Sequence, residues 1–332
     1  MTSIRFKKIG YINLLVAAIT ALSIADNAIA EESLGSVTLQ NHNFAGSKAD
    51  GYTNGIFLSR VRMSSPNENN VDSSLLLEPT VTWLGMPKPT LASSSLNQIM
   101  ITPHAIELRI PDPNDVPYVG ELVFRSANVY VHDNVADLLA LNLGVLGPAS
   151  GAAQMQRFIH RVLKDTRPEG WSSQGGNKPL VEIDAYRAWR YHWPDSGNGR
   201  TSGDFVALGG AALGNQESSV GVTLLARYGI DLNRSFPTVV RLNGRSGDPI
   251  AINNSWFAYT GFSADHIISN TGIGSNTPGN NSQLRKTQVV PVVGIAYGWL
   301  RSSLTFSLQS PPPLIESGHH RQSFGSITYI WH

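Results

Sequence analysis

A glutamine and a histidine four residues apart have the spacing in this sequence that best suits chemistry. Gln156 and His160 lie within residues 149–164, where apolar residues recur at helical intervals. Residues four apart share one face of a helix, so both side chains point the same way. An imidazole beside a carboxamide could move a proton or orient a water molecule. Taken alone, the spacing favours a plainer interpretation, in which His160 is a packing or surface histidine on a short helix.

The same segment carries an apolar stripe, which is typical of an amphipathic helix. Met155, Phe158, Ile159 and Val162 recur at helical spacing, and Gln156 and His160 lie on an adjacent stripe. A short helix is therefore predicted at about residues 150–164.

The surrounding sequence has a period of two residues instead. In residues 220–232, every second side chain from Val220 to Leu232 is apolar or aromatic, and the run is long enough to cross a bilayer at a tilt. Further strands are predicted at 34–44, 52–63, 95–102, 120–132, 135–146, 180–192, 204–213, 253–265, 287–300, 303–309 and 326–331. The pattern predicts an all-β protein, a transmembrane antiparallel β-barrel of about 12 strands.

Composition agrees with a membrane barrel. Hydrophobic residues make up 41% of the chain and charged residues only 15%, whereas about a quarter is usual in soluble proteins. The net charge of +1 argues against a nucleic-acid partner. Four tryptophans near predicted strand ends suggest an aromatic girdle at the membrane surface; they are Trp83, Trp171, Trp193 and Trp299. A soluble periplasmic β-sandwich also alternates and is the rival fold.

The first residues resemble an export signal. Arg5, Lys7 and Lys8 precede a mostly apolar stretch from Ile9 to Ile24. Residues 28–30, Ala-Ile-Ala, fit the small-x-small pattern of a cleavage site. We therefore expect a cleaved signal peptide at 1–30 and one outer-membrane barrel domain at 31–332; a membrane anchor is the alternative. With no cysteine, the chain has no disulfide or thiol chemistry.

Four ordered motifs occur between about residues 38 and 177. They are Gln40-Asn41-His42-Asn43-Phe44 with Gly51-Tyr52-Thr53-Asn54-Gly55, then Ile101-Thr102-Pro103, then Asp115-Val116-Pro117-Tyr118-Val119-Gly120, and last GVLGPASG at 144–151 with QRFIHR at 156–161 and Gly170-Trp171-Ser172-Ser173-Gln174. Together they resemble the outer-membrane lipid A 3-O-deacylases. The rest of the chain is similar to that family mainly in its strand pattern.

The resemblance implies a fold, a substrate and a mechanism. The fold is a twelve-stranded barrel whose site lies between the wall and a short helix near the outer leaflet. His160 would be the general base that activates water against the ester at position 3 of lipid A, releasing an acyloxyacyl chain. Gln156 would orient the water or the base, and Asn41 and Thr53 would help bind the oxyanion. The partner would be the lipid A of lipopolysaccharide in the outer leaflet, met by a monomeric barrel embedded in the membrane.

Calcium is the cofactor that the family implies, and His42 departs from that pattern. The family has an aspartate there, whose oxygen suits a hard cation better than an imidazole does. Three outcomes follow: a different metal, catalysis without metal in which His42 contacts substrate, or loss of activity. The metal ligands are therefore unknown. Two smaller departures are Asp115-Val116, which lacks the family's arginine, and Asn177-Lys178, where Asn-Glu is common.

Two other functions compete with hydrolysis by His160. One is a catalytically degenerate barrel of the same family that binds lipid or a surface partner. The other is a phospholipase with a serine nucleophile, for which the sequence has no Gly-x-Ser-x-Gly motif.

Basic residues could meet the phosphates of lipid A. Candidates are Lys48, Arg60, Arg62, Arg109 and Lys178. Arg109 is favoured as a substrate-binding residue because it follows the Thr-Pro motif; ordinary solvated charge is the alternative for each.

Overall fold

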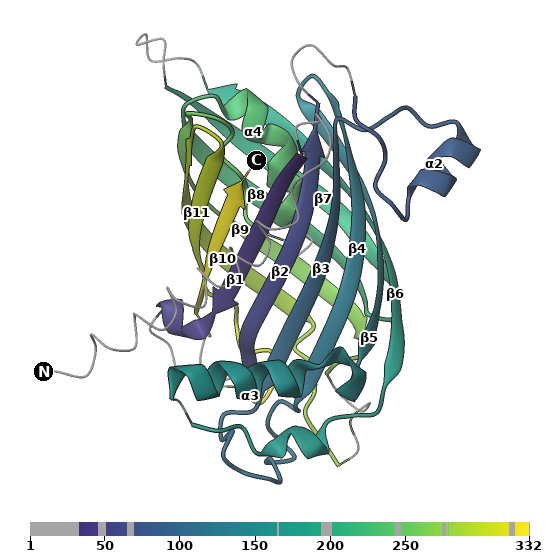
Figure 1. Cartoon of the computed structure of the whole chain (residues 1–332), viewed down its shortest axis with the longest axis vertical. Coiled ribbons are helices and arrows are strands. Elements are labelled where there is room, and N and C mark those ends of the chain that lie inside the picture. Colours follow the sequence, from purple (N-terminus) through teal and green to yellow (C-terminus); the bar gives the residue numbers. More distant parts are fainter. Residues whose placement is uncertain are drawn as a thin grey trace, which may run out of the picture.

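The described chain forms a closed β-barrel (Figure 1). The computed structural model describes residues 33–45, 51–64, 70–164, 166–193, 201–242, 247–273, 277, 279–318 and 323–331. Within them are twelve strands: β1 Ser33–Asn41, β2 Gly51–Met63, β3 Leu91–Thr102, β4 Val119–His132, β5 Val135–Leu146, β6 Lys178–Trp193, β7 Ser202–Gly214, β8 Glu217–Gly229, β9 Trp256–Asn270, β10 Thr287–Trp299, β11 Ser302–Gln309 and β12 Phe324–Trp331.

Each strand pairs antiparallel with its neighbour in sequence, and β1 closes the barrel against β12. All twelve predicted strands are confirmed, and closure excludes the β-sandwich. Some boundaries differ: β9 runs to Asn270 rather than 265, and β3 begins at Leu91 rather than 95. The predicted signal peptide at 1–30 lies outside the described residues.

The two faces of the wall differ as the alternation predicts. Val220, Val222 and Leu224 face outward and are about half exposed, whereas Thr223 and Arg227 face the lumen and are buried. At the end of the barrel where β1 begins and β12 finishes, the terminal end, outward aromatic side chains form a band. This aromatic girdle comprises Trp189, Tyr191, Trp193, Phe205, Tyr228, Trp256, Tyr297, Trp299, Tyr329 and Trp331.

Two tryptophans predicted for the girdle lie elsewhere. Trp83 belongs to the helix α2 (Glu78–Leu84) in the long connection between β2 and β3. Trp171 is buried in the 3-10 turn η3 (Gly170–Ser173) at the opposite end of the barrel. Neither ring projects from a strand of the wall, because an aromatic residue close to a strand in sequence need not belong to it.

Helices and short turns occupy the connections. They are η1 His42–Ala45, α2, η2 Pro148–Ser150, α3 Ala152–Leu163, η3, α4 Leu232–Val239 and η4 Val240–Leu242. In the described part of the chain, no helix combines the length and apolarity that crossing a bilayer requires.

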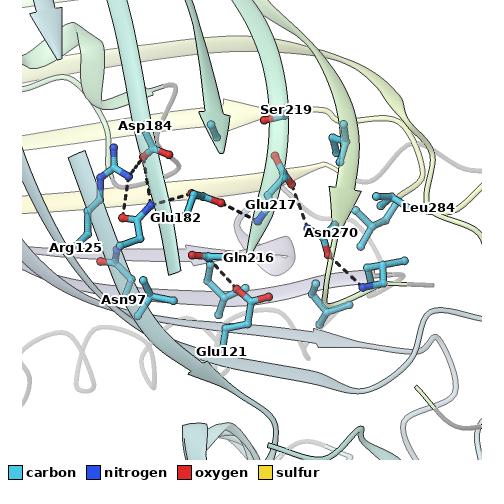
Figure 2. A pocket seen from close by; sticks show the side chains of 18 of the residues that line it. Asn97, Glu121, Arg125, Glu182, Asp184, Gln216, Glu217, Ser219, Asn270 and Leu284 are labelled. Atoms are coloured by element: carbon cyan, nitrogen blue, oxygen red, sulfur yellow. Dashed lines mark hydrogen bonds and ion pairs between the residues drawn. The ribbon is translucent and has the colours of Figure 1, made fainter. Parts of the chain in front are cut away.

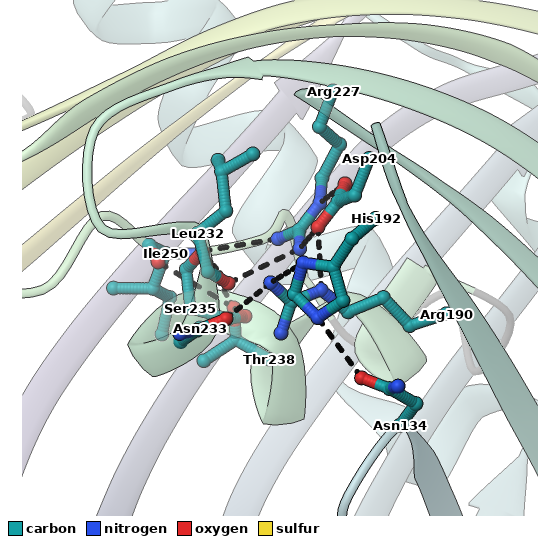
Figure 3. A network of polar contacts seen from close by, with 10 residues as sticks. All are labelled: Asn134, Arg190, His192, Asp204, Arg227, Leu232, Asn233, Ser235, Thr238 and Ile250. Atoms are coloured by element: carbon teal, nitrogen blue, oxygen red, sulfur yellow. Dashed lines mark hydrogen bonds and ion pairs between the residues drawn. The ribbon is translucent and has the colours of Figure 1, made fainter. Parts of the chain in front are cut away.

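The helix α4 closes the lumen at the terminal end. Phe236 and Val239 are fully buried among inward side chains of the strands, such as Leu138 and Phe257. A buried charge network holds this helix (Figure 3). Asp204 of β7 binds Arg190 (Nε–Oδ2 2.7 Å) and Arg227 (Nη2–Oδ2 2.6 Å). Arg227 also donates to Ser235 Oγ (3.0 Å) and to the carbonyl oxygen of Leu232 (3.2 Å) on α4.

Replacing Asp204 tests how far the barrel depends on this network. Asp204→Ala leaves two buried guanidinium groups without their shared carboxylate, and we expect the free energy of unfolding to fall by roughly 3–5 kcal/mol. Equilibrium urea unfolding in detergent measures it. Glu316→Gln, which breaks the partly exposed Arg285–Glu316 pair (3.4 Å), is the control and should change little. Equal effects of the two substitutions would contradict the role given to the network.

Candidate active site

The helix α3 lies across the outer face of β3 and β4, at the end of the barrel opposite the terminal end (Figure 1). This end is called the α3 end below. Ala152, Ala153 and Ile159 pack against Met100 of β3 and are buried. Because inward and outward side chains alternate along β3, Met100 faces out of the barrel, so the helix covers the wall from the lipid side.

The predicted apolar stripe of α3 is not the face that meets the barrel. Of Met155, Phe158, Ile159 and Val162, only Ile159 is buried; the other three are exposed on the far side of the helix. A helix between a protein wall and lipid has two apolar faces, and the small residues Ala152 and Ala153 make the one that packs closely.

Gly120 allows this close approach. It pairs with Met100 on the outward face, and a Cβ atom there would lie 2.4 Å from Cβ of Ala152 and 2.5 Å from Oγ of Ser150. Neither contact is possible for a real side chain, so glycine at 120 fixes how near the helix comes to β4.

Gln156 is the polar residue on the buried face of α3, with 0% of its surface exposed. Its Oε1 accepts a hydrogen bond of 2.6 Å from the indole nitrogen of Trp171. Because the indole can only donate, the oxygen of the amide must face Trp171 and Nε2 must face away. That nitrogen has no protein partner among the described residues. Gln156 therefore keeps two N–H donors without a described protein partner in the buried layer between the helix and the wall.

Trp171 is itself held in place by its surroundings. Its ring packs on Tyr118, with centroids 4.9 Å apart. Burial raises the pKa of Tyr118 to about 12, so its hydroxyl stays protonated and donates to the carbonyl oxygen of Ile106 (2.9 Å).

His160 lies one helical turn beyond Gln156 and is partly exposed. Its Nδ1 is within hydrogen-bond distance of the carbonyl oxygen of Thr166, in the segment just after the helix. A carbonyl oxygen only accepts, so Nδ1 must carry a proton, and in the neutral imidazole Nε2 then holds the lone pair. The ring is thereby fixed in the tautomer in which Nε2 can accept a proton.

The other predicted site residues lie on the first two strands. Asn41, the last residue of β1, is buried and its Nδ2 donates to Oδ1 of Asn54 on β2. Asn41, Asn54 and Met100 occupy consecutive paired positions on the outward face of β1, β2 and β3. This row leads from Asn41 to the residue that α3 covers, so the structure brings Asn41 and Gln156 to the same side of the wall.

For three other predicted residues, the structure gives a position but no contact with Gln156 or His160. Thr53 lies at a register irregularity of β2, between Tyr52 and Asn54, and its side chain is not described. His42 begins η1, directly after Asn41, and is partly buried. Arg109 is exposed in the connection from β3 to β4, which packs against η3: Glu169 N donates to the carbonyl oxygen of Ile106 at 2.8 Å.

Asn54 is a residue of this cluster that the sequence interpretation missed. It stood within the quoted Tyr-Thr-Asn-Gly motif, but the bulge at Thr53 decides which residue faces Asn41. A bulge leaves little trace in a single sequence, so the sequence alone does not show that Asn54 faces Asn41.

The described donors do not fit a calcium ion. Asn41 uses Oδ1 to accept from the backbone N–H of Asn43 (2.7 Å), and Nδ2 to donate to Asn54. The imidazole of His42 is a poor ligand for a hard cation. Within the described ranges, no group of three or more His, Cys, Asp or Glu side chains is arranged to hold a metal.

A second polar region lies inside the barrel, on the other side of the wall (Figure 2). Its cavity of about 120 Å³ is lined by Glu121, Arg125, Glu182, Asp184 and Glu217, among others. Arg125 forms a buried ion pair with Asp184, and Asn142 donates to Glu182 (2.8 Å). Among its described lining residues there is no histidine, so its chemistry differs from that beside α3.

Fold and site together define an outer-membrane β-barrel with a polar cluster between its wall and an external helix. The chain belongs to the LpxR outer membrane protein family, whose model, described as outer membrane protein LpxR, matches residues 12–332. It is therefore a protein of the outer membrane.

A solved structure supports the barrel architecture. The fold is similar to that of LpxR from Salmonella typhimurium, with a TM-score of 0.71, 17% sequence identity, and coverage of 90% of this chain and 99% of that one. An outer membrane channel from Pseudomonas putida F1 has a TM-score of 0.42 at 12% identity, covering 92% of this chain and 97% of that one. No curated protein sequence matches the chain.

Proposed function

We propose that this barrel is a lipid A 3-O-deacylase in which His160 activates water. One observation carries the proposal. A histidine held in a single tautomer and a fully buried carboxamide with unpartnered donors share one helix, on the lipid-facing side of an LpxR-family barrel. A lipid substrate reaches this place from the membrane, and the exposed Met155, Phe158 and Val162 give α3 an apolar outer face for acyl chains.

In the proposed reaction, Nε2 of His160 takes a proton from a water molecule. The water oxygen attacks the carbonyl carbon of the ester at position 3 of lipid A, and the carbonyl oxygen becomes an oxyanion. Gln156 Nε2 is a donor for the oxyanion or the attacking water, and Asn41 and Thr53 support it. The ester C–O bond then breaks, the sugar oxygen takes the proton back from His160, and the acyloxyacyl chain leaves as a carboxylic acid.

Substrate binding in this proposal uses residues at the same end of the barrel. Arg109 lies in the exposed connection beside η3, where it can meet a lipid A phosphate. His42, next to Asn41, faces the substrate as a polar group, and the reaction runs without calcium because the described donors do not suit that ion.

The second candidate is a catalytically degenerate barrel of the same family, which binds lipid without cleaving it. His42 is the observation that favours it, because the position for a family aspartate holds an imidazole. The three predictions below separate the two candidates.

Removing the base should abolish turnover. We expect His160→Ala to lower the rate of ester cleavage about a hundredfold or more, because the variant lacks the imidazole on α3 that takes the proton from water. Release of the 3-linked chain from lipid A vesicles, followed by mass spectrometry, measures it. His266→Ala, which removes an exposed histidine of β9, is the matched control and should leave the rate unchanged. Normal release of the 3-linked chain by the His160 variant would contradict the proposal.

Trp171 should act as a positioning residue through Gln156. Trp171→Phe keeps a ring against Tyr118 but removes the indole N–H, so the Gln156 amide is free to rotate. We expect kcat to fall about tenfold, the equivalent of one buried hydrogen bond, with KM little changed. In a Gln156→Ala background the same substitution should have no further effect. Losses that simply add would show that Trp171 serves packing alone.

The residue at 42 should decide whether calcium matters. The native chain should keep its activity in excess chelator, whereas His42→Asp should become faster when calcium is added, because a carboxylate suits that ion. Initial rates with and without calcium measure both. Loss of native activity in chelator would contradict the metal-free reaction. Activity found only in the aspartate variant would favour the degenerate barrel.

A further inference from the structure

The connection between β2 and β3 carries an apolar surface that the proposed function does not use. Its described part, residues 70–90, is called the β2–β3 arm here. Leu75, Trp83 and Leu84 of the arm have 70%, 82% and 55% of their surfaces exposed. In Figure 1, α2 projects sideways from the wall rather than over the barrel opening. Three large apolar side chains left exposed on one short segment need a partner.

The base of the arm is fixed to the outside of the wall. Ser126 and Asn128 of β4 face outward, since they alternate with the lumenal Arg125, yet both are fully buried. The backbone N–H of Ser74 donates to Asn128 Oδ1 (2.9 Å), and that of Leu76 donates to Ser126 Oγ (3.2 Å). Polar groups that would otherwise meet lipid are thus satisfied by the arm.

The helix α2 also has a buried face, which fixes its orientation. Leu77 and Val81 are buried, with 4% and 5% of their surfaces exposed, and Gly85 caps the C-terminus of α2 with its backbone N–H. Trp83 and Leu84 therefore project from a folded segment with a defined orientation.

The arm stands where the aromatic girdle is interrupted. Girdle rings contact one another across neighbouring strands, as Trp193 of β6 does with Phe205 of β7 at a centroid distance of 5.0 Å. The last of them, Trp331, lies over Gly35 of β1, where a Cβ atom would come within 2.4 Å of the ring. Gly35 pairs with Arg60 of β2, and the same outward row continues through Ser94 to Ser126, so these four positions hold no aromatic residue. Tyr130, nearer the end of β4, also faces outward, but it is buried. The arm covers this stretch and supplies Trp83.

We propose that the β2–β3 arm completes the girdle and anchors the barrel in the membrane leaflet at the terminal end. Tryptophan favours the membrane surface, where its ring is among acyl chains and its N–H meets head groups. Between residues 70 and 90 the arm has Asp72, Glu78 and Lys88 as its charged residues, and Asp72 pairs with Lys88 at 2.7 Å. The contact is therefore apolar and does not depend on anionic lipid. The inference is independent of catalysis at the α3 end.

The absence of cysteine from the chain makes a site-specific test possible. In Trp83→Cys, a single environment-sensitive fluorophore reports the surroundings of position 83 in the full chain, reconstituted in phospholipid nanodiscs. Thr82→Cys is the matched control: Thr82 is exposed, donates to Glu78 Oε1 (3.2 Å), and projects about 100° around the helix from Trp83. Both sites are at the surface, so folding should be retained; the heat-dependent gel shift of a folded barrel checks it.

We expect a quencher attached to lipid near the head group to quench the label at 83 at least threefold more than at 82. Iodide in the water should show the reverse order, and both ratios should be the same with and without anionic lipid. Equal access of iodide to the two labels would overturn the anchor. Protection of position 83 from both quenchers would also overturn it, and would mean that a protein surface, such as a second copy, covers α2.

Discussion

Polar groups on the lipid-facing side of a barrel wall must find their partners within the protein, and this constraint shapes the molecule. Lipid offers no hydrogen bonds, so an outward asparagine or glutamine is costly unless another segment covers it. At the α3 end, the row through Asn41 and Asn54 leads to Met100, which α3 covers, and the helix brings Gln156 to the same side of the wall. At the terminal end, the β2–β3 arm does the same for Ser126 and Asn128.

The covering of the wall by α3 also has a chemical consequence. Small residues on α3 and Gly120 on β4 let the helix approach closely, which excludes water from the Gln156 side chain. In so dry a place, an unpartnered N–H group interacts strongly with developing negative charge. Trp171 orients the amide of Gln156, and the backbone carbonyl of Thr166 orients the ring of His160. The proposed site therefore needs no buried carboxylate to orient its histidine.

Much of this could be predicted from the sequence, and the failures have physical reasons. Period-two alternation located every described strand, because each wall residue faces either lipid or lumen. The change of period located α3, but hydrophobicity could not tell which face meets the wall. Met155 and Phe158 are apolar because they face outward from the barrel, and Ile159 because it packs on the wall. The pairing of Asn41 with Asn54 depends on the bulge in β2, and the pairing of Asp204 with Arg227 depends on the register of β7 and β8. Neither a bulge nor a register is encoded by a single residue.

The central claim is that a folded LpxR-family barrel with this site cleaves one ester of lipid A. Its most direct test is the mass spectrum of lipid A from a Gram-negative host that lacks such a deacylase and expresses the native chain in its outer membrane. The account predicts a new lipid A species lighter by the 3-linked acyloxyacyl chain, with the other acyl chains retained. Unchanged lipid A, with the barrel folded in that membrane, would contradict it.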